Sequence, residues 1–216
     1  RHTQDKVTKA IYLDQVEYAS ALRTIAHSEL SSKKSDEAAG VELHSLYRSL
    51  LGAVAFLLLT RIDVAVFVSA LQRWGHAPKI IHVKRLNALT KWIQANPKRL
   101  VYGPFTAREN RQVVTGVHQR VFSDSAFKKE EQTGHCMRGA AYLLCPGDND
   151  DAFKGTAPCH LLDFISRQQR KVVRATFSAE LMGACDAVDK GMLLSHMLHE
   201  IYTGDCTHQF STERSP

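Results

Sequence analysis

The stretch YRSLLGAVAFLLLTRIDVAVFVSALQRW, residues 47–74, holds the longest apolar segment of the chain and decides the fold of its first half. Its run Leu50–Leu59 is free of charge, but Arg61 and Asp63 follow at the middle of the apolar segment. A transmembrane helix needs about 20 apolar residues, and a charge at the bilayer centre costs about 2.5–3.5 kcal/mol. We therefore expect two buried helices that meet at a turn, and no membrane partner.

The elements around this stretch follow from periodicity and from turn residues. Upstream, we expect a short strand, a helix and then a polar loop, over residues 11–13, 15–27 and 28–40. Three helices should then cover residues 46–59, 63–74 and 79–95, with Asp63 as the N-cap of the second. Residues 96–104 hold two Pro and one Gly that end this helical region, and the polar residues 106–115 form the predicted linker.

After the linker the pattern changes to short β-compatible runs. These runs cover residues 117–122, 139–145 and 160–166, and a long helix is expected over residues 178–201. Three strands followed by a helix in one small unit predict an α/β or α+β domain. The chain as a whole is therefore expected to be of the α/β (α+β) class, with a helical region first.

Composition fits an ordinary globular protein of 216 residues, but charge is divided unevenly. Residues 1–120 hold 18 Lys and Arg against 9 Asp and Glu, a net charge of +9. Residues 121–216 hold 10 Lys and Arg against 13 Asp and Glu, a net charge of −3.

The five cysteines are an odd number without a CxxC pair, which excludes a disulfide framework and a zinc ribbon and favours an intracellular location.

The basic excess is sharpest over residues 73–111, where nine Lys and Arg face a single acid, Glu109. This run is either a solvated helix face or a surface that attracts a polyanion. On the second interpretation it predicts salt-sensitive, non-specific nucleic-acid binding. We assign Trp92 to the core rather than to a base-stacking platform. The candidate phosphate-binding residues are Arg73, Lys79, Lys84, Arg85, Lys91, Lys98 and Arg99.

Two carboxylates in the second half are candidates for metal chemistry. Asp124 ends an apolar strand, and the carboxyl edges of sheets host ligands in α/β folds. Glu180 lies in the first turn of the long helix. The helix dipole stabilises a carboxylate at this position, which is a structural reason for an acid there that involves no metal. Each acid alone is typical of a structural role, whereas together they form a candidate divalent-metal pair.

Several segments, in order along residues 11–203, resemble the Pol polyprotein of copia-type retrotransposons. Residues 47–74 are similar to the family's YRSLVGxLxYLxxTRPDIAYAVSxLSRF, and HVKRLNALTKWIQANPKRLVYG to the HWxAxKRILRYLKGT...LxY segment that follows it. IYLDQVEYA at residues 11–19 is similar to I-x-L-x-Q-x-x-Y-a. FSDSAF resembles the YSDADWA strand, and SRQQRKVVRATFSAEL aligns without a gap with SKKQxxVALSSTEAEY.

The resemblance implies the end of a reverse transcriptase, its thumb and connection region, followed by the beginning of ribonuclease H. That enzyme cleaves the RNA strand of an RNA·DNA hybrid with two Mg²⁺ ions, which need several carboxylate ligands. Carried over by position, Asp124 and Glu180 would be catalytic metal ligands. Three hydroxyl residues lie close to these two carboxylates in the sequence and could contact a ribose 2′-OH: Ser123, Ser125 and Thr176.

Important parts of both enzymes are missing. No apolar strand carries the adjacent aspartates of the polymerase site, and the third and fourth carboxylates of ribonuclease H have no clear counterpart. At 100° per residue, Asp186 and Asp189 point 240° and 180° away from Glu180. Asp205 follows the helix at a suitable distance, but its polar setting does not predict a strand.

We therefore expect a fragment of Pol that binds hybrid and carries an incomplete hydrolysis site, with the rest of Pol as a partner. One alternative is a non-catalytic nucleic-acid-binding remnant. A helix-turn-helix module over residues 46–95 is a weaker alternative, because its second helix lacks a polar recognition face. The expected regions are the reverse transcriptase palm/thumb end (1–45), the basic connection region (46–105), a partial ribonuclease H-like domain (116–203) and a tail (204–216).

Overall fold

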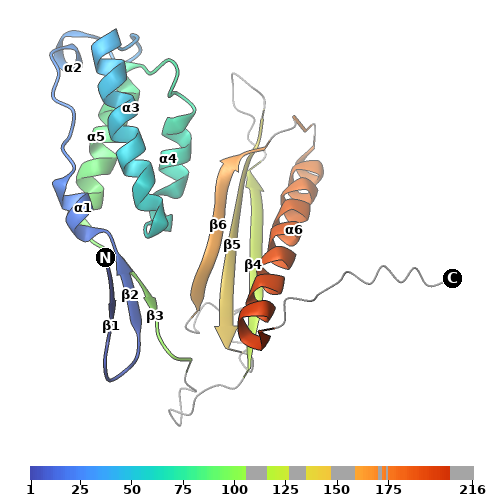
Figure 1. The fold of residues 1–216 in the computed structure, drawn as a ribbon. Helices are drawn as coiled ribbons and strands as arrows, with labels where there is room; N and C mark the ends of the chain where they lie inside the picture. The colour runs from blue at the N-terminus through green and yellow to red at the C-terminus, as the bar shows by residue number, and fades with distance from the viewer. Residues whose placement is uncertain (106–115, 127–134, 147–158, 170–171, 174, 205–216) are drawn as a thin grey trace. The chain divides into compact units, whose positions relative to one another are not determined.

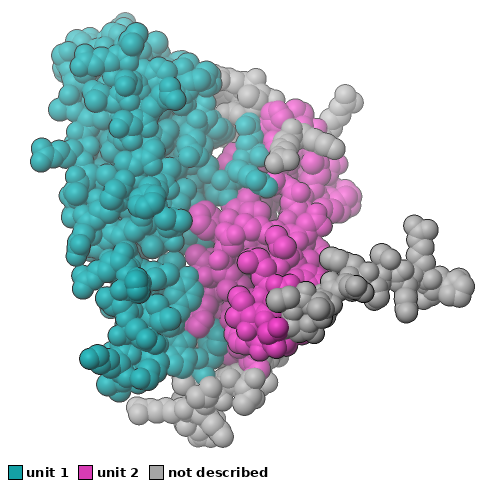
Figure 2. All heavy atoms as spheres, viewed as in Figure 1, with its two compact units in different colours: residues 1–115, 166–168 teal, residues 116–165, 169–216 magenta. Residues whose placement is uncertain are grey.

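A computed structural model describes residues 1–105, 116–126, 135–146, 159–169, 172–173 and 175–204. Asp205 and the predicted linker and tail lie outside these described residues, apart from Gly204. The fold is mixed α/β with two three-stranded antiparallel sheets, as the sequence predicts at the level of class. Contacts divide the chain into two compact units, coloured separately in Figure 2. Unit 1 is Arg1–Thr115 with Ser166–Gln168, and unit 2 is Gly116–Ile165 with Gln169–Pro216.

Helices build most of unit 1 (Figure 1). Its core is formed by α3, α4 and α5, with Tyr47, Val68 and Leu86 completely buried. Tyr47 also donates a hydrogen bond from its hydroxyl to the carbonyl of Leu71, at 2.8 Å, which joins α3 to α4. The helical segments are α1 (Val16–Ala21), α2 (Glu29–Ser32), α3 (Val41–Phe56), η1 (Leu57–Leu59), η2 (Ile62–Val64), α4 (Ala65–Gln72) and α5 (Ile80–Ala95).

The two buried helices predicted from the apolar stretch are confirmed as α3 and α4. Asp63, however, does not cap α4, because the N-cap is Val64 and no side chain bonds there. Two 3₁₀ turns separate the helices, and Asp63 lies in the second, where its carboxylate binds Arg61 instead. A buried guanidinium competes for this carboxylate with the free N–H groups of the helix end, and the ion pair is the stronger interaction.

One segment among the described residues, Val41–Leu59, is long and apolar enough to cross a membrane by length and composition. Core helices of globular proteins meet the same criterion. In this fold the segment contributes Leu43, Tyr47, Val54 and Leu57 to the helical core, all without exposed surface.

A small sheet is also part of unit 1, with the strand order β1 (His2–Gln4), β2 (Ile11–Asp14) and β3 (Arg99–Tyr102). The predicted strand at residues 11–13 corresponds to β2, which pairs with β3 from Ile11 opposite Tyr102 to Asp14 opposite Arg99. Because of this pairing, the segment after α5 returns to the N-terminal hairpin (Figure 1).

Unit 2 is a sheet of β4 (Val117–Ala126), β5 (Met137–Pro146) and β6 (His160–Gln168), with α6 (Thr176–Thr203) along one face (Figure 1). The three predicted strands and the long helix are thus confirmed, each a few residues longer than expected. β4 and β5 pair without a bulge, which places Asp124 opposite Gly139. Every fourth residue of the first half of α6 is small and buried: Ala179, Gly183, Ala187 and Gly191.

Two cysteines of unit 2 lie side by side. Cys145, in β5, and Cys159, just before β6, have their Sγ atoms 3.1 Å apart, and neither forms a disulfide. Burial, together with the hydrogen bond to Cys159, raises the pKa of the Cys145 thiol to about 12. Cys145 is therefore a protonated, unreactive thiol at neutral pH.

Candidate nucleic-acid interface

Helix α5 is divided lengthwise between a buried side and a cationic side. Leu86, Thr90 and Ile93 are buried on the side that faces the core. At 100° per residue, the exposed residues of the helix from Lys84 onward span only about 120° of its circumference. These exposed residues are Lys84, Arg85, Ala88, Lys91, Trp92 and Ala95. We name Lys84, Arg85, Lys91 and Trp92 the basic stripe.

Electrostatically, the basic stripe is uncompensated within its own helix, because α5 contains no acidic residue. No described acid lies within ion-pair distance of Lys84, Arg85 or Lys91, and all three are exposed. Two turns of helix separate Lys84 from Lys91, a rise of about 10.5 Å with Arg85 between them. Around the helix, Lys91 lies about 20° from Lys84, whereas Arg85 lies about 100° from Lys84. Three unpaired cations on one side of a helix attract a polyanion and release its counterions on binding.

Trp92 belongs to this cationic side, and the expectation that it is a core residue is wrong. Its side chain is 44% exposed. The guanidinium carbon of Arg61 lies 5.5 Å from the ring centroid and Nζ of Lys98 lies 5.8 Å from it, both within cation–π range. Trp74, by contrast, is stacked on His82 with ring centroids 4.2 Å apart.

Asp63 holds both cations that contact Trp92. Its carboxylate accepts hydrogen bonds from Nε and Nη2 of Arg61, at 2.9 and 3.1 Å, and pairs with Nζ of Lys98 at 3.1 Å. Burial opposes ionisation of Asp63, but the bonds to Arg61 and Lys98 outweigh it and lower the pKa of this carboxyl. Arg61 is 3% exposed and also reaches the carbonyl of Ile93, so the guanidinium beside Trp92 is fixed in place.

The remaining candidate cations occupy the two ends of α5 and the neighbouring elements. Lys79 is the exposed N-cap residue of α5, and Arg73 follows α4, where it is half-buried and engaged in interactions of its own. Lys98 forms an ion pair with Asp63. Arg99 opens β3, with its guanidinium carbon 4.4 Å from the ring centroid of Tyr12. The structure thus groups Lys84, Arg85 and Lys91, whereas Lys98 and Arg99 have contacts within unit 1.

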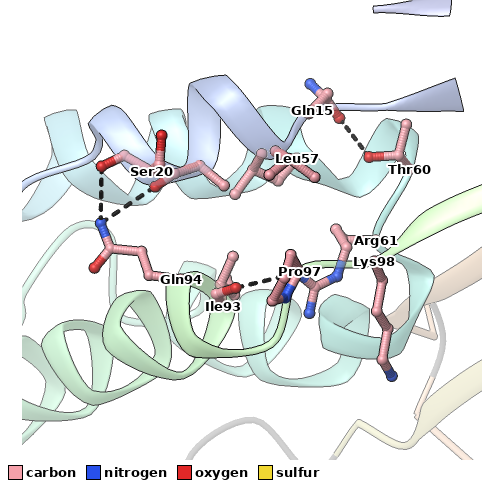
Figure 3. Close-up of a pocket in the computed structure, with 11 residues that line it drawn as sticks. Gln15, Ser20, Leu57, Thr60, Arg61, Ile93, Gln94, Pro97 and Lys98 are labelled. Carbon is pink, nitrogen blue, oxygen red and sulfur yellow. Dashed lines mark hydrogen bonds between the residues drawn. The ribbon is translucent and has the colours of Figure 1, made fainter.

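A cavity of about 90 Å³ lies behind α5, lined by residues of α1, η1 and the end of α5 (Figure 3). Inside it, Nε2 of Gln94 donates to the carbonyls of Ala19, Ser20 and Leu22, at 3.2, 3.4 and 2.7 Å. These carbonyls end α1, so Gln94 caps that helix from outside. Ligand pockets usually measure about 300–1,000 Å³, and this cavity is too small for a nucleotide. The outer side of α5 is the candidate ligand surface because it carries the basic stripe.

Asp124 and Glu180 have different surroundings in unit 2. Ser125 and Val121 contact the small-residue side of α6, since a Cβ added to Gly183 would lie 2.4 Å from Oγ of Ser125. A Cβ added to Gly191 would lie 3.0 Å from Val121. Side chains alternate along a strand, so Asp124 belongs to the face that α6 does not cover. Among the described residues, no hydrogen bond or ion pair joins Asp124 to Glu180.

Other residues considered for the hydrolytic site have structural roles. Asp186 forms an ion pair with Arg138, a buried residue of β5. Ser125 is 4% exposed and accepts a hydrogen bond from Nε2 of Gln169 at 3.3 Å. The same amide nitrogen donates to the carbonyl of Ala179 at 2.8 Å, which ties the start of α6 to β4. Ser125 is therefore a packing residue rather than an exposed contact for a ribose.

The donor set for two Mg²⁺ ions is not complete in the described part of the chain. No group of three or more His, Cys, Asp or Glu side chains gathers there in a metal-binding arrangement. Two ions about 3.5–4 Å apart need several oxygen ligands to offset their repulsion. Asp124 and Glu180 stay predicted ligands, and the described residues alone do not fit a two-ion site.

Sequence reasoning missed Asn87 and Gln94, the polar residues that attach α5 to the N-terminal segment. The side-chain amide of Asn87 is half-buried and hydrogen-bonded to the backbone of Ile25. The seven-residue spacing of the two amides, which places both on one flank of the helix, is the signal that could have found them.

No protein-family model, no curated protein and no solved structure matches this chain. The resemblance to copia-type Pol therefore rests on the motifs quoted above, and membership of that family stays a prediction.

Proposed function

We propose that this chain binds the phosphate backbone of nucleic acid, an RNA·DNA hybrid above all, through the basic stripe of α5. The chain would be the fragment of copia-type Pol that holds the hybrid, with the rest of Pol as its partner. On this proposal the chain does not complete hydrolysis of the RNA strand, because the donor set for two Mg²⁺ ions is incomplete among the described residues. The observation that carries the proposal is the group of three exposed, unpaired cations on one side of a helix without acids.

Phosphate binding suits this stripe better than recognition of base edges. Lys and Arg contact phosphates without reading sequence, and the helix offers no exposed Asn or Gln that would pair with an adenine edge. Asn87 and Gln94 are both occupied by backbone groups of residues 19–25. The expected binding is therefore non-specific in sequence and steeply dependent on salt.

The test is a fluorescence-anisotropy titration of a labelled RNA·DNA hybrid with the full 216-residue chain. The variant Lys84→Ala/Arg85→Ala/Lys91→Ala removes the cations of the stripe. We expect it to weaken binding by about tenfold or more at about 0.1 M salt, because three phosphate contacts are lost.

A charge-matched control separates the stripe from the overall charge. The variant Lys6→Ala/Lys34→Ala/Arg48→Ala removes three exposed cations of unit 1 that lie outside α5. We expect this control to retain most of the affinity. Equal losses in the two triple variants would show that net charge alone, and not the stripe, governs binding, and would refute the proposal.

A further inference from the structure

We infer that Trp92 is a stacking platform for an unpaired nucleobase, so that the basic stripe takes single-stranded nucleic acid by its bases as well as its phosphates. This inference rests on the proposed function, because the cations of the stripe must bring the strand to the ring. The inference adds two points to that function: single strands are ligands, and the aromatic ring of Trp92 is the contact that selects them.

Exposure and position both support this role. Trp92 lies directly after Lys91 in the sequence and about two helical turns from Arg85, so the ring and the cations share one side of α5. The indole stays 44% exposed although Arg61 and Lys98 are already in contact with it. A ligand can therefore reach part of the ring without displacing the residues that support it.

Arg61, which lies against the ring, is itself held by several contacts. Arg61 is held by Asp63 and by the carbonyl of Ile93, and it is 3% exposed. Its guanidinium thus lies against the ring in a fixed position, 5.5 Å from the centroid. An aromatic side chain that is already ordered loses little conformational entropy when a base stacks on it, which favours binding.

The chemistry explains why single strands would be preferred at this residue. Bases within a duplex are stacked on their neighbours and offer no free face, whereas a single strand can turn a base onto the indole. Stacking of a base on an aromatic side chain contributes about 5- to 150-fold in affinity and tolerates any base. The rise of about 10.5 Å from Lys84 to Lys91 corresponds to about three nucleotides of a stacked strand.

The experiment compares two ligands that have the same phosphates but differ in their bases. One is an oligonucleotide of about 12 nucleotides, oligothymidine or oligouridine, and the other is an abasic strand of equal length. We expect the full chain to bind the base-containing strands at least fivefold more tightly than the abasic strand. The thymidine and uridine arms show whether DNA and RNA are both accepted.

Variants of Trp92 then assign the difference to the ring. Trp92→Leu keeps an apolar side chain without a π face and should abolish the preference for bases, while Trp92→Tyr should retain most of it. Circular dichroism checks that both variants fold. In the Trp74→Phe background, Trp92 is the sole tryptophan, and its fluorescence should be quenched by the base-containing strands but not by the abasic strand.

The outcomes separate this inference from the proposed function. Binding of both strands with equal affinity, or a preference that survives in Trp92→Leu, would overturn the stacking role while leaving backbone binding intact. Absence of salt-sensitive binding to every ligand, the hybrid included, would refute the proposed function itself.

Discussion

The side-chain amide of Asn87 on α5 pairs with both backbone groups of Ile25, accepting from its N–H and donating to its carbonyl at 2.8 Å each. The side-chain amide thus supplies the N–H and C=O hydrogen-bond partners that the backbone of a neighbouring strand would give to Ile25. Gln94, two turns later, captures three carbonyls at the end of α1. One flank of α5 thus anchors the N-terminal segment, and another flank carries the basic stripe. Substitutions on the first flank should therefore change stability, and substitutions on the second should change binding.

The first prediction uses this separation. Asn87→Ala leaves the N–H and carbonyl of Ile25 without their partners and should lower the free energy of unfolding by about 1–3 kcal/mol. Lys91→Ala, on the exposed flank, should change it by no more than about 0.5 kcal/mol and instead weaken hybrid binding. Urea denaturation followed by circular dichroism measures the first effect. An Asn87→Ala variant as stable as the parent would show that the clamp on Ile25 contributes nothing.

The second prediction concerns His82 and acid stability. Burial, then the charges of Arg85 and Lys79, lowers the pKa of His82 to about 4. Its Nδ1 accepts the N–H of Lys79 at 3.0 Å, and this bond needs the neutral ring. The folded state therefore disfavours protonation, so stability should be complete above pH about 6.5 and fall as the pH drops from about 6.5 to about 4, by about 3 kcal/mol.

His82→Gln is the variant that isolates this effect. A glutamine at the third position of a helix can accept the same N-cap N–H without titrating. We expect its free energy of unfolding to be nearly constant over that pH range, even if loss of the stacking on Trp74 lowers its value at neutral pH. Parallel pH profiles in parent and variant would contradict the assignment to His82.

The third prediction tests the contact of α6 with β4. Gly183→Ala places a Cβ against Oγ of Ser125, a buried atom already bound by Gln169, and should destabilise unit 2 by about 1–3 kcal/mol. Gly52→Ala in α3 is the matched control, since nothing lies within 4 Å of its new Cβ. That change should stabilise its helix by about 0.5–1 kcal/mol.

A second substitution tests the mechanism of this destabilisation. Ser125→Ala removes the Oγ atom that collides with the new methyl group, whereas the Cβ of Ser125 is 3.7 Å away and fits. The double variant Gly183→Ala/Ser125→Ala should therefore regain stability relative to Gly183→Ala, as measured by amide hydrogen exchange in α6 and β4. Additive effects of the two substitutions would place the strain elsewhere.

The fourth prediction concerns catalysis. Because the described residues do not complete a two-ion donor set, the isolated chain should not cleave the RNA strand of a hybrid in Mg²⁺ above the rate without protein. Gel electrophoresis of end-labelled hybrid measures this, with Asp124→Asn and Glu180→Gln as companions. Cleavage that both substitutions abolish would show that the site is complete after all.

Sequence patterns predicted the long elements and the four-residue strand β2, but missed the short strands β1 and β3. β4, β5 and β6 each have nine or ten residues and α6 has 28, so their periodicity was evident without tertiary context. β1 and β3 have three and four residues, and their strand pairing depends on contacts distant in the chain.

The same contrast applies to the candidate site. Helical periodicity placed Lys84 and Lys91 outward, as the structure has them. Trp92 was assigned to the core from the amphipathic division of the helix, although its angle on the helix places it about 20° from Arg85. The ion pair between Arg61 and Asp63 could not be predicted by N-cap rules, because it depends on burial of the guanidinium beneath α5.

The most direct test of the central claim, that the basic stripe binds phosphates, is the slope of log affinity for the RNA·DNA hybrid against log salt concentration. Each phosphate contact contributes about −0.9 to this slope. We predict that K84A/R85A/K91A has a slope shallower than the parent by about 2–3, while the charge-matched control K6A/K34A/R48A keeps the parental slope. Equal slopes in the parent and the stripe variant would contradict the claim.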